Sequence, residues 1–461
     1  MSISIHGRLR KTIWWDLEFN VPLFVKPAKG RCKEFLIRGD IWCASVAERG
    51  LLATLVSSCF GCHLRVLESR LWLFHRVPAP KGEYAVEIFG EGLRMGVLEY
   101  NNGWQLYPSG ALASLIAGFG CPVIEVKQRR RLKGKKVCLD ALNVTNTNVH
   151  FTPYLLISSG SHIGPARVVE ETQSCLCVKV RDMAPKGFKL FQCSNIRDVV
   201  ELNSAYLKQA ELEAISFLKR WVKRFPVYVA VSGGIDSGAS LVLTVEAFGP
   251  HRVKAVYVDT GMEFKASQDY VVKLSNTLGV DVDFVEANQS LDSLVREYGL
   301  PSRDNRWCTR KLKLEPLRKF YEKKGVKLVI EGVRAYESTA RARSPRVAYN
   351  PLLPGIRRLF PIHEWTRLEV QMYMAWKNMP VNELYDKGFT RIGCIICPAM
   401  HLFELHTSYI VERHRFVELV KVFADALDSS YDETIKVILD GRWRFRSKQL
   451  SKDLGIEEQG S

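Results

Sequence analysis

The clearest pattern of apolar and polar positions lies in the second half of the chain. Residues 226–231 are continuously apolar and rich in valine, which is typical of a parallel strand buried on both faces. A short glycine-containing segment follows, and then a helical tract from Gly238 to Phe248. A second apolar strand begins at Val256. This alternation predicts an α/β domain with a doubly wound parallel sheet, whose ligands bind at the carboxyl ends of the strands.

The segment before the first of these strands predicts one long amphipathic helix over Glu201–Arg224. Its apolar residues recur at steps of three or four, as the face of a helix requires. They are Leu202, Tyr206, Leu212, Ile215, Leu218 and Trp221.

Short alternating segments predict β-structure between about Gly134 and Leu190. The expected strands are Val137–Leu142, Tyr154–Ile157, Ala166–Val169 and Cys175–Val180. Residues 1–126 are mixed, with a strand-like run at Tyr84–Phe89 and an apolar segment at Ala111–Phe119. We therefore expect three parts: an N-terminal mixed α/β region (1–126), a small β-barrel (127–200) and the α/β domain (201–461).

Composition and charge add a candidate partner. The chain has 461 residues, 47% of them apolar and 25% charged, which suits two or three globular domains. Its formal net charge of +17 attracts polyanions. Nucleic acid is the first candidate and an acidic membrane the second, with a merely solvated cationic surface as the alternative. Basic residues cluster in Lys127–Lys136 and Arg334–Arg346.

The chemical state expected for the cysteines depends on the cellular compartment of the protein. No apolar run reaches the roughly 18 residues of a membrane span, and the N-terminus lacks the apolar core of a signal peptide, so we expect a cytoplasmic protein without a membrane partner. Twelve cysteines then point to metal or redox use for some of them rather than to disulfides.

The N-terminal cysteines allow several interpretations. Cys59, Cys62 and His63 have the spacing of haem attachment, which would need an exported protein. Cys32, Cys43, Cys59 and Cys62 have irregular spacing for zinc. Buried structural thiols are the favoured interpretation.

The segment Ser232-Gly-Gly-Ile-Asp-Ser237, between the first strand and its helix, predicts a phosphate site. Gly233 and Gly234 let the backbone turn tightly and approach an anion. Successive amides at the start of a helix favour negative charge, and the hydroxyls of Ser232 and Ser237 can add donors. The segment does not end in Gly-Lys-Ser/Thr, so it is not a Walker motif.

Further blocks follow in order at residues 256–264, 306–317, 331–338 and 391–398. Together with the phosphate loop they resemble the phosphoadenosine phosphosulfate (PAPS) reductase family of the PP-loop superfamily, over roughly Glu201–Glu418. The resemblance implies a HUP-like fold that binds ATP with Mg²⁺. It also implies roles for individual residues. Ser232, Gly233, Gly234, Asp236 and Ser237 would bind phosphate together with Gly332, while Asp259 and Thr260 would lie near ribose or adenine. The expected catalytic residues are Asp236, Lys311 and Arg334. Lys311 and Arg334 would supply charge to phosphate or sulfate oxygens, so Arg334 is also an expected cofactor-binding residue.

Cys308, Cys394 and Cys397 are the candidate metal ligands. Cys394-Ile-Ile-Cys397-Pro398 has a spacing and a proline familiar from iron–sulfur ligation. Relatives with a cluster carry two adjacent cysteines in the first block, where this chain has Trp307 and Cys308. Three thiolates on a [4Fe-4S] cluster would leave one iron open to sulfur. Zinc with His363 or His401 as fourth ligand, and no metal, are the alternatives.

Two other comparisons shape the functional hypotheses. The reductases need a nucleophilic cysteine in their tail, whereas no cysteine follows Cys397 here. Lys135–Asp140, Ile163–Val169 and Val178–Arg181 resemble a PUA domain, a barrel fused to RNA-modifying enzymes.

We therefore expect an ATP-dependent RNA sulfurtransferase acting on tRNA or rRNA, with a sulfur donor or reductant protein as a further partner. A sulfonucleotide reductase, a DNA phosphorothioation enzyme and a non-enzymatic RNA- or nucleotide-binding protein are the alternatives.

Overall fold

A six-stranded sheet forms the centre of the C-terminal half, in the order β17-β16-β15-β18-β20-β19. All neighbouring strands are parallel except β19 and β20. The strands are β15 (Val227–Val231), β16 (Val253–Asp259), β17 (Asp281–Glu286), β18 (Leu328–Glu331), β19 (Val347–Asn350) and β20 (Leu353–Leu359). The predicted α/β fold with a doubly wound parallel sheet is confirmed.

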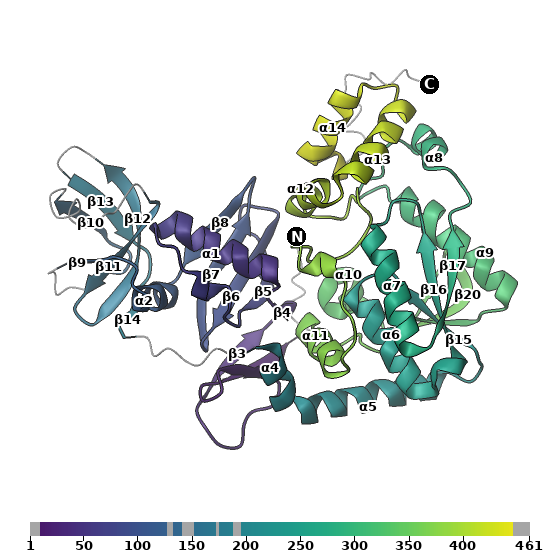
Figure 1. The fold of residues 1–461 in the computed structure, drawn as a ribbon, viewed down its shortest axis with the longest axis horizontal. Coiled ribbons are helices and arrows are strands. Elements are labelled where there is room, and N and C mark those ends of the chain that lie inside the picture. The colour runs from purple at the N-terminus through teal and green to yellow at the C-terminus, as the bar shows by residue number, and fades with distance from the viewer. Residues whose placement is uncertain (1–9, 127–131, 141–151, 172–174, 188–194, 446–461) are drawn as a thin grey trace. The chain divides into compact units, whose positions relative to one another are not determined.

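Helices cover both faces of this sheet because its strands are apolar on both sides (Figure 1). Val227, Val229 and Val231 pack into a core with α5, α6, α7 and α11, whereas Tyr228 faces the opposite core with α9. These helices are α5 (Ser204–Trp221), α6 (Ile235–Phe248), α7 (Lys265–Leu278), α9 (Glu315–Lys324) and α11 (Arg367–Trp376).

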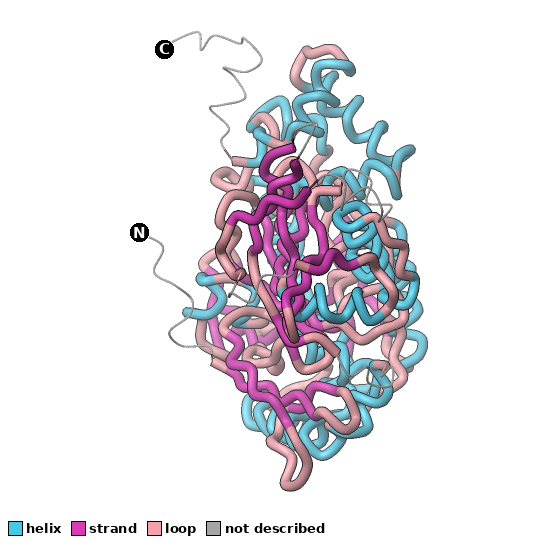
Figure 2. Tube along the Cα trace, turned by 90° about the vertical axis from the view of Figure 1, so that its left-hand side faces the viewer, coloured by secondary structure: helices cyan, strands magenta, loops and turns pink. Residues whose placement is uncertain are grey.

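A third core lies among the remaining helices. Within the described residues, every element that follows β20 is helical (Figures 1 and 2). Trp307, Phe264 and Phe416 are buried in it. Its helices are α8 (Leu291–Tyr298), α12 (Leu402–Val411), α13 (Arg413–Ala426) and α14 (Tyr431–Asp440), with short turns at 309–314, 335–337, 383–385 and 442–444 and α10 (Thr339–Arg343) nearby in sequence.

The structure, a computed structural model, describes residues 10–126, 132–140, 152–171, 175–187 and 195–445. The chain forms two units, one over His6–Tyr206 and one over Leu207–Ser461 with Met1–Ile5. Three features of the sequence are affected by these gaps. The tail beyond 445 and Cys193 lie outside the described residues, and so does the first half of the basic run, residues 127–131. Within those residues, no helix has both the length and the hydropathy needed to cross a bilayer.

The N-terminal unit begins with two antiparallel sheets. The first has the order β2-β1-β3 and the second β4-β5-β6-β7-β8; α1 (Val46–Phe60) lies between β4 and β5 in sequence, and α2 (Gly110–Gly118) follows β8. The strands are β1 (Lys11–Asp16), β2 (Val21–Leu23), β3 (Cys32–Ile37), β4 (Ile41–Cys43), β5 (Leu73–Val77), β6 (Tyr84–Gly90), β7 (Leu93–Tyr100) and β8 (Trp104–Pro108). The predicted strand at Tyr84–Phe89 and the apolar segment at Ala111–Phe119 correspond to β6 and α2.

The third sheet of this unit has the order β10-β13-β12-β11-β9, with β14 beside β12. Its strands are β9 (Val123–Glu125), β10 (Lys136–Asp140), β11 (Tyr154–Ser159), β12 (His162–Glu171), β13 (Cys175–Val180) and β14 (Ala184–Pro185). The four predicted strands are present, although residues 141 and 142 of the first lie outside the described residues. Because β9 pairs with β11, this sheet begins before residue 127. Its likeness to a PUA domain stays a prediction.

The single helix predicted over Glu201–Arg224 is wrong in one respect. Two helices, α4 (Ile196–Leu202) and α5, meet at Asn203. The Asn203 side chain accepts a hydrogen bond from the Phe24 amide and donates to the Pro22 carbonyl, each at 2.9 Å. A polar residue that bonds to a neighbouring segment interrupts the helix, while the apolar period on either side continues.

The expectation that the cysteines avoid disulfides is also wrong. Cys62 is bonded to Cys121, and Cys138 to Cys177. Cys138 and Cys177 are directly opposite on β10 and β13, which brings their side chains together. The zinc site considered for Cys32, Cys43, Cys59 and Cys62 does not form among the described residues, since Cys62 is taken by its disulfide.

Candidate active site

The phosphate loop lies where β15 meets α6, as its sequence predicts. Gly233 adopts a φ of +75°, which side chains disfavour, and a Cβ there would come within 2.6 Å of Ser267 Cβ. Gly234 is the N-cap of α6. A Cβ at Gly234 would meet only Tyr385 Oη at 3.5 Å and Ser232 Oγ at 3.9 Å, so it would point into the space that the loop encloses.

Hydrogen bonds within the loop hold it in this shape. The Ser232 amide donates to Ser237 Oγ at 3.1 Å, and that hydroxyl donates to the Gly234 carbonyl at 2.9 Å. The Ile235 amide donates to Tyr385 Oη at 3.0 Å. The amides of Gly233 and Gly234 have no acceptor among the described residues. Exposed amides at the start of a buried helix are the donors that a phosphate group requires.

An ion pair joins the loop to the end of β18. Arg334 Nε lies 2.8 Å from Asp236 Oδ1, and the Arg334 side chain is only 4% exposed. Asp236 and Arg334, both predicted as catalytic, are therefore partners of each other. Burial would raise the pKa of Glu337, but the nearby Arg334 and Arg341 lower it, and this carboxylate accepts the Arg334 amide at 3.0 Å.

Gly332 lies against the first turn of α6. A Cβ at this position would come within 2.4 Å of the Asp236 carbonyl group and of the Ser237 amide. The glycine thus permits the close packing of two backbone segments that carry the predicted site. The resemblance gave Gly332 a cofactor-binding role, and that role stays a prediction beside this packing requirement.

The carboxyl end of β16 opens into a pocket of about 390 Å³. Asp259, Thr260 and Gly261 line it together with Glu286 and Arg415. Asp259 accepts the Gly261 amide at 2.8 Å, and Arg415 donates to the Gly261 carbonyl at 2.8 Å. The position predicted for ribose or adenine is therefore a polar cavity at the carboxyl edge of the sheet.

Lys311 forms an ion pair with Glu315, and not with Asp236 or Arg334. It is on the π-helical turn Thr309–Leu314, and its Nζ is 3.3 Å from Glu315. π-helical turns are frequent at functional sites. Its predicted contact with phosphate stays a prediction.

The three candidate metal ligands come together at the third core. Cys397 is buried in this core, with Cys308 and Cys394 packed against it. Burial raises the pKa of Cys308, and burial with the nearby Glu263, Cys397 and Cys308 raises that of Cys394. Cys394 Sγ donates to Glu263 Oε1 at 3.8 Å. The three cysteines thus share one core, and their role as metal ligands stays a prediction.

The spacing of these sulfurs bears on the metal. Their three Sγ atoms do not all lie within 4.8 Å of one another. Thiolates on one zinc ion are about 3.8 Å apart, since Zn–S bonds are about 2.3 Å and tetrahedral. The thiolates of an iron–sulfur cluster bind different irons and lie further apart. The three sulfurs as they lie are therefore not arranged around one ion, and the identity of the metal stays a prediction.

Neither histidine proposed as a fourth zinc ligand points to that role. His363 Nε2 is 3.1 Å from the Arg341 carbonyl, and the ring is buried there. His401 is the N-cap of α12, and its ring stacks on Phe403. Trp307, at the position of the missing cysteine, is 1% exposed and donates to the Gly299 carbonyl at 3.0 Å.

Two contributors to the site were missed at the sequence level. Tyr385 contacts the phosphate loop from 150 residues away. Glu263 lies beside Cys394, and burial raises its pKa even though Thr260 donates to it through its amide and hydroxyl. Glu263 lies within the block at residues 256–264, two residues after Asp259-Thr-Gly, so its acidic side chain could have been noticed. Nothing in the sequence pointed to Tyr385.

The tail of the chain contacts the loop after Cys397 with arginine. Arg444 is buried and donates to the Met400 carbonyl at 2.7 Å. Its own carbonyl accepts the Arg303 amide at 2.7 Å, while Arg303 Nε donates to the Pro398 carbonyl at 2.9 Å. The described tail therefore packs on the cysteine loop through a guanidinium and not through a thiol.

Comparison with known proteins identifies the domain. Residues 226–400 match the model of the phosphoadenosine phosphosulfate reductase domain. The chain is 28% identical over 394 residues to an uncharacterised protein of Methanocaldococcus jannaschii, covering 82% of this chain and 91% of that protein. A second uncharacterised protein of that organism is 34% identical over 259 residues, and the chain spans 52% of its length.

Named relatives match a smaller part. The adenosine 5'-phosphosulfate reductase of Salinibacter ruber is 30% identical over 143 residues, which are 31% of this chain and 56% of that enzyme. A crystal structure of phosphoadenylyl-sulfate reductase from Candida auris, a phosphate complex, is 22% identical, with a TM-score of 0.33 over 45% of this chain and 98% of that one.

Proposed function

Because residues 226–400 form a phosphoadenosine phosphosulfate reductase domain, we propose that this protein is an ATP-dependent sulfurtransferase that adenylates and thiolates a base in RNA. The observation that carries the proposal is the pairing of two features. The phosphate loop is complete, whereas the tail brings the Arg444 guanidinium to the cysteine loop. The first suits ATP, and the second leaves the described tail without a sulfur nucleophile.

The phosphate loop suits the pyrophosphate part of ATP. The amides of Gly233 and Gly234 would donate to phosphate oxygens, and Ser232 Oγ lies 3.4 Å from Ser237 Oγ at the same site. Mg²⁺, when bound to ATP, would neutralise part of the phosphate charge. The pocket beside Asp259 would hold the nucleoside, because it lies at the same edge of the sheet.

The reaction follows from this arrangement. The carbonyl oxygen of the base attacks the α-phosphorus of ATP, and pyrophosphate leaves toward the loop amides. A sulfur nucleophile then adds to the activated base carbon, and AMP leaves with the oxygen. Positioning and charge neutralisation supply the catalysis, in which the Asp236–Arg334 pair fixes the first turn of α6.

Cys308, Cys394 and Cys397 would hold the sulfur-carrying group. An iron–sulfur cluster bound by three thiolates supplies an iron that has no protein ligand and can accept sulfur. Glu263 beside Cys394 adds a buried acid whose raised pKa suits proton exchange with that sulfur.

RNA is the proposed substrate because of the charge and the second unit. The net charge of +17 favours a polyanion. A second pocket, of about 410 Å³, lies between α2 and the sheet of β9 and β11, with Lys186 at its wall. Lys186 pairs with Glu125 there at 3.6 Å, so the pocket carries one charged group of each sign, and the proposal of RNA depends on the net charge and on the likeness to a PUA domain.

A second candidate is reduction of a sulfonucleotide. Relatives named adenosine 5'-phosphosulfate reductase favour it. That reaction would release sulfite and consume no ATP. Sulfite from labelled sulfonucleotide, with no thionucleoside formed, would establish it in place of the sulfurtransferase.

The test incubates anaerobically purified full-length protein with ATP, Mg²⁺, sulfide and bulk RNA from cells that lack the gene. Nucleosides are then analysed by mass spectrometry. We expect a new thionucleoside that needs ATP and disappears in Asp236→Ala. Folded, cluster-loaded protein that forms no thionucleoside would refute the proposal.

A further inference from the structure

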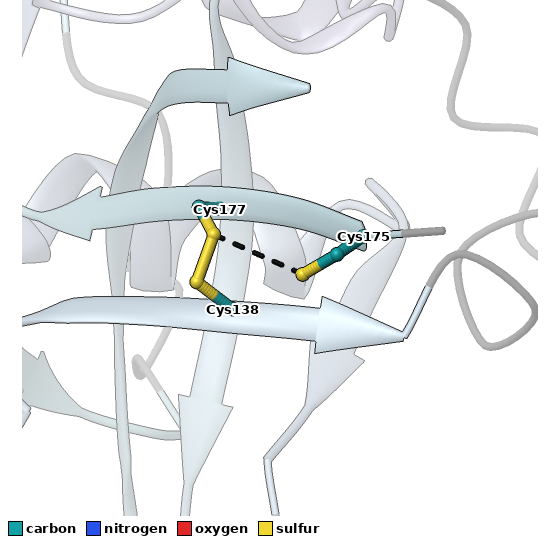
Figure 3. Close-up of side chains that lie close together, drawn as sticks. All are labelled: Cys138, Cys175 and Cys177. Atoms are coloured by element: carbon teal, nitrogen blue, oxygen red, sulfur yellow. Dashed lines mark hydrogen bonds between the residues drawn. A yellow bond between two sulfur atoms is a disulfide. The ribbon is translucent and has the colours of Figure 1, made fainter. Parts of the chain in front are cut away.

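Three cysteines outside the candidate active site gather on the small sheet of the N-terminal unit (Figure 3). Cys138 of β10 is directly opposite Cys177 of β13, and Cys175 is two residues before Cys177 on the same strand. Alternate residues of a strand share a face, and directly opposed residues do too. All three side chains therefore lie on one face, and their sulfurs are within 4.8 Å of one another.

This face is the one away from the apolar core. Val137, Leu139, Val178 and Val180 occupy the other face and pack into the core of the sheet. The cysteines thus alternate with core residues along both strands. Cys138 is exposed, Cys175 is half-buried and Cys177 is buried. A solute can reach the group without unfolding the sheet.

The distance between two of the sulfurs matches a tetrahedral metal site. Cys175 Sγ lies 3.8 Å from Cys177 Sγ. Two thiolates on one zinc ion are separated by about 3.8 Å, the edge of a tetrahedron with Zn–S bonds of about 2.3 Å. Cys138 is bonded to Cys177 by a disulfide, so it becomes a third ligand only after that bond is reduced.

We propose that the reduced group of Cys138, Cys175 and Cys177 binds one zinc ion through three thiolates, with water in the fourth position. A dithiol reductant would open the disulfide by giving two electrons and two protons, and would itself become a disulfide. Binding of Zn²⁺ would then release the three thiol protons. The disulfide and the zinc site are two states of one group.

Nearby charges suit the bound state. Zinc with three thiolates carries a net charge of −1. Lys136 and Lys179 are directly opposite each other, two residues from Cys138 and Cys177, on the same face. Lys136 also pairs with Glu170, which lies beside Cys177 on β12. Because Glu170 already neutralises Lys136, Lys179 is the lysine that offsets the charge of the metal site, and the metal joins β10 to β13 in a sheet with a small core.

The site is separate from the proposed function. Its sulfurs are closer together than those of Cys308, Cys394 and Cys397 and suit one ion. The test therefore uses full-length protein in which those three cysteines are serines, so that only this group is measured. Wild-type protein, with zinc and iron both quantified, provides the second measurement if the triple variant does not fold.

Protein reduced with a phosphine is titrated anaerobically with Zn²⁺, and with Co²⁺, whose charge-transfer band reports thiolate ligands. We expect about one metal ion per chain. Cys175→Ser should weaken binding by at least about 10- to 100-fold, since even the loss of an outer partner of a metal ligand has that effect. Cys32→Ser, a free cysteine on β3, is the matched control and should leave binding unchanged.

Two results would overturn the proposal. One is protein in which a count of free thiols shows that the disulfide is open, yet neither ion binds. The other is equal affinity in Cys175→Ser and its parent.

Discussion

At the scale of single residues, the phosphate loop depends on glycines with different tasks. Gly332 lets two backbone segments pack at a distance that no Cβ allows. A Cβ at Gly234 would make only ordinary contacts, the nearest at 3.5 Å with Tyr385 Oη, and its φ is an ordinary −85°. One glycine is therefore needed to fold the site, and the other to leave room for a ligand.

This difference predicts opposite effects of one added methyl group. Gly332→Ala should lower the free energy of unfolding by about 1–3 kcal/mol or more, because the Cβ overlaps the Asp236 carbonyl. Gly234→Ala should cost less than about 1 kcal/mol, the loss of a good N-cap, yet remove ATP binding. Denaturant titration and calorimetry measure the two quantities. ATP binding retained by folded Gly234→Ala would contradict the assignment of the loop.

The Glu337 carboxylate predicts a pH dependence. Its pKa is lowered by Arg334 and Arg341, so its stabilising effect is present above the usual glutamate pKa of about 4.3 and is lost as pH falls through the lowered value. Glu337→Gln should therefore be less stable than wild type at neutral pH. The difference in unfolding free energy should narrow as the pH is lowered below about 4.3. If the difference in unfolding free energy does not change with pH, the attraction of Arg334 and Arg341 for the Glu337 carboxylate is not its cause.

At the residue scale, the sequence predicts sites whose residues are consecutive in the chain. Ser232–Ser237 could be predicted because strand, glycines and helix are consecutive. The pairing of Asp236 with Arg334 could not, since both were assigned to phosphate. Tyr385 could not be found either, because only tertiary packing brings its hydroxyl to Ile235.

At the scale of elements, the cysteine loop is held by the tail. Arg444 donates to the carbonyls of Met400 and Gly441 from a buried position. Hydrogen bonds from a charged group are worth about 1.5–3 kcal/mol. The turn 442–444 therefore fixes the backbone next to Cys397.

A matched pair of arginines tests this contact. Arg444→Met should destabilise the protein by about 1.5–3 kcal/mol, because it leaves buried carbonyls without a donor. Arg442→Met, whose side chain is 73% exposed, should change stability by less than about 0.5 kcal/mol. Equal losses in the two variants, measured by denaturant titration, would show that the buried contact is not what stabilises the tail.

The two cysteine groups should differ in the metal they hold. Anaerobically purified wild type should contain iron and acid-labile sulfide, since the spacing and the proline of Cys394-Ile-Ile-Cys397-Pro398 are familiar from iron–sulfur ligation. Cys394→Ser should lose both, whereas Cys175→Ser should keep them. Iron that persists in Cys394→Ser but not in Cys175→Ser would reverse the assignment.

Elements were predictable where one period dominates. The strands β15 and β16 and the helix α6 were predicted from apolar runs, whereas β17, β18 and β20 were not assigned from the sequence. The break between two helices at Asn203 could not be predicted, because the apolar period continues through it. The Asn203 side chain bonds to Pro22, which is far away in sequence. The disulfides were missed for a related reason: strand register, which pairs Cys138 with Cys177, is not readable from spacing.

At the scale of the whole molecule, the proposed function needs two things: a domain at residues 226–400 that binds and activates ATP, and a basic chain that binds RNA. Charge predicted a polyanionic partner, but a net charge of +17 does not identify the polyanion. ATP turnover reports on ATP binding and RNA binding at once, because adenylation needs the nucleotide and its acceptor together.

The most direct measurement therefore follows the products of ATP in the presence and absence of RNA. With sulfide and reductant present, full-length protein should release AMP and pyrophosphate in equal amounts, matched by thionucleoside, and only when RNA is added. ADP and phosphate as products, or AMP formation that RNA does not stimulate, would contradict the account.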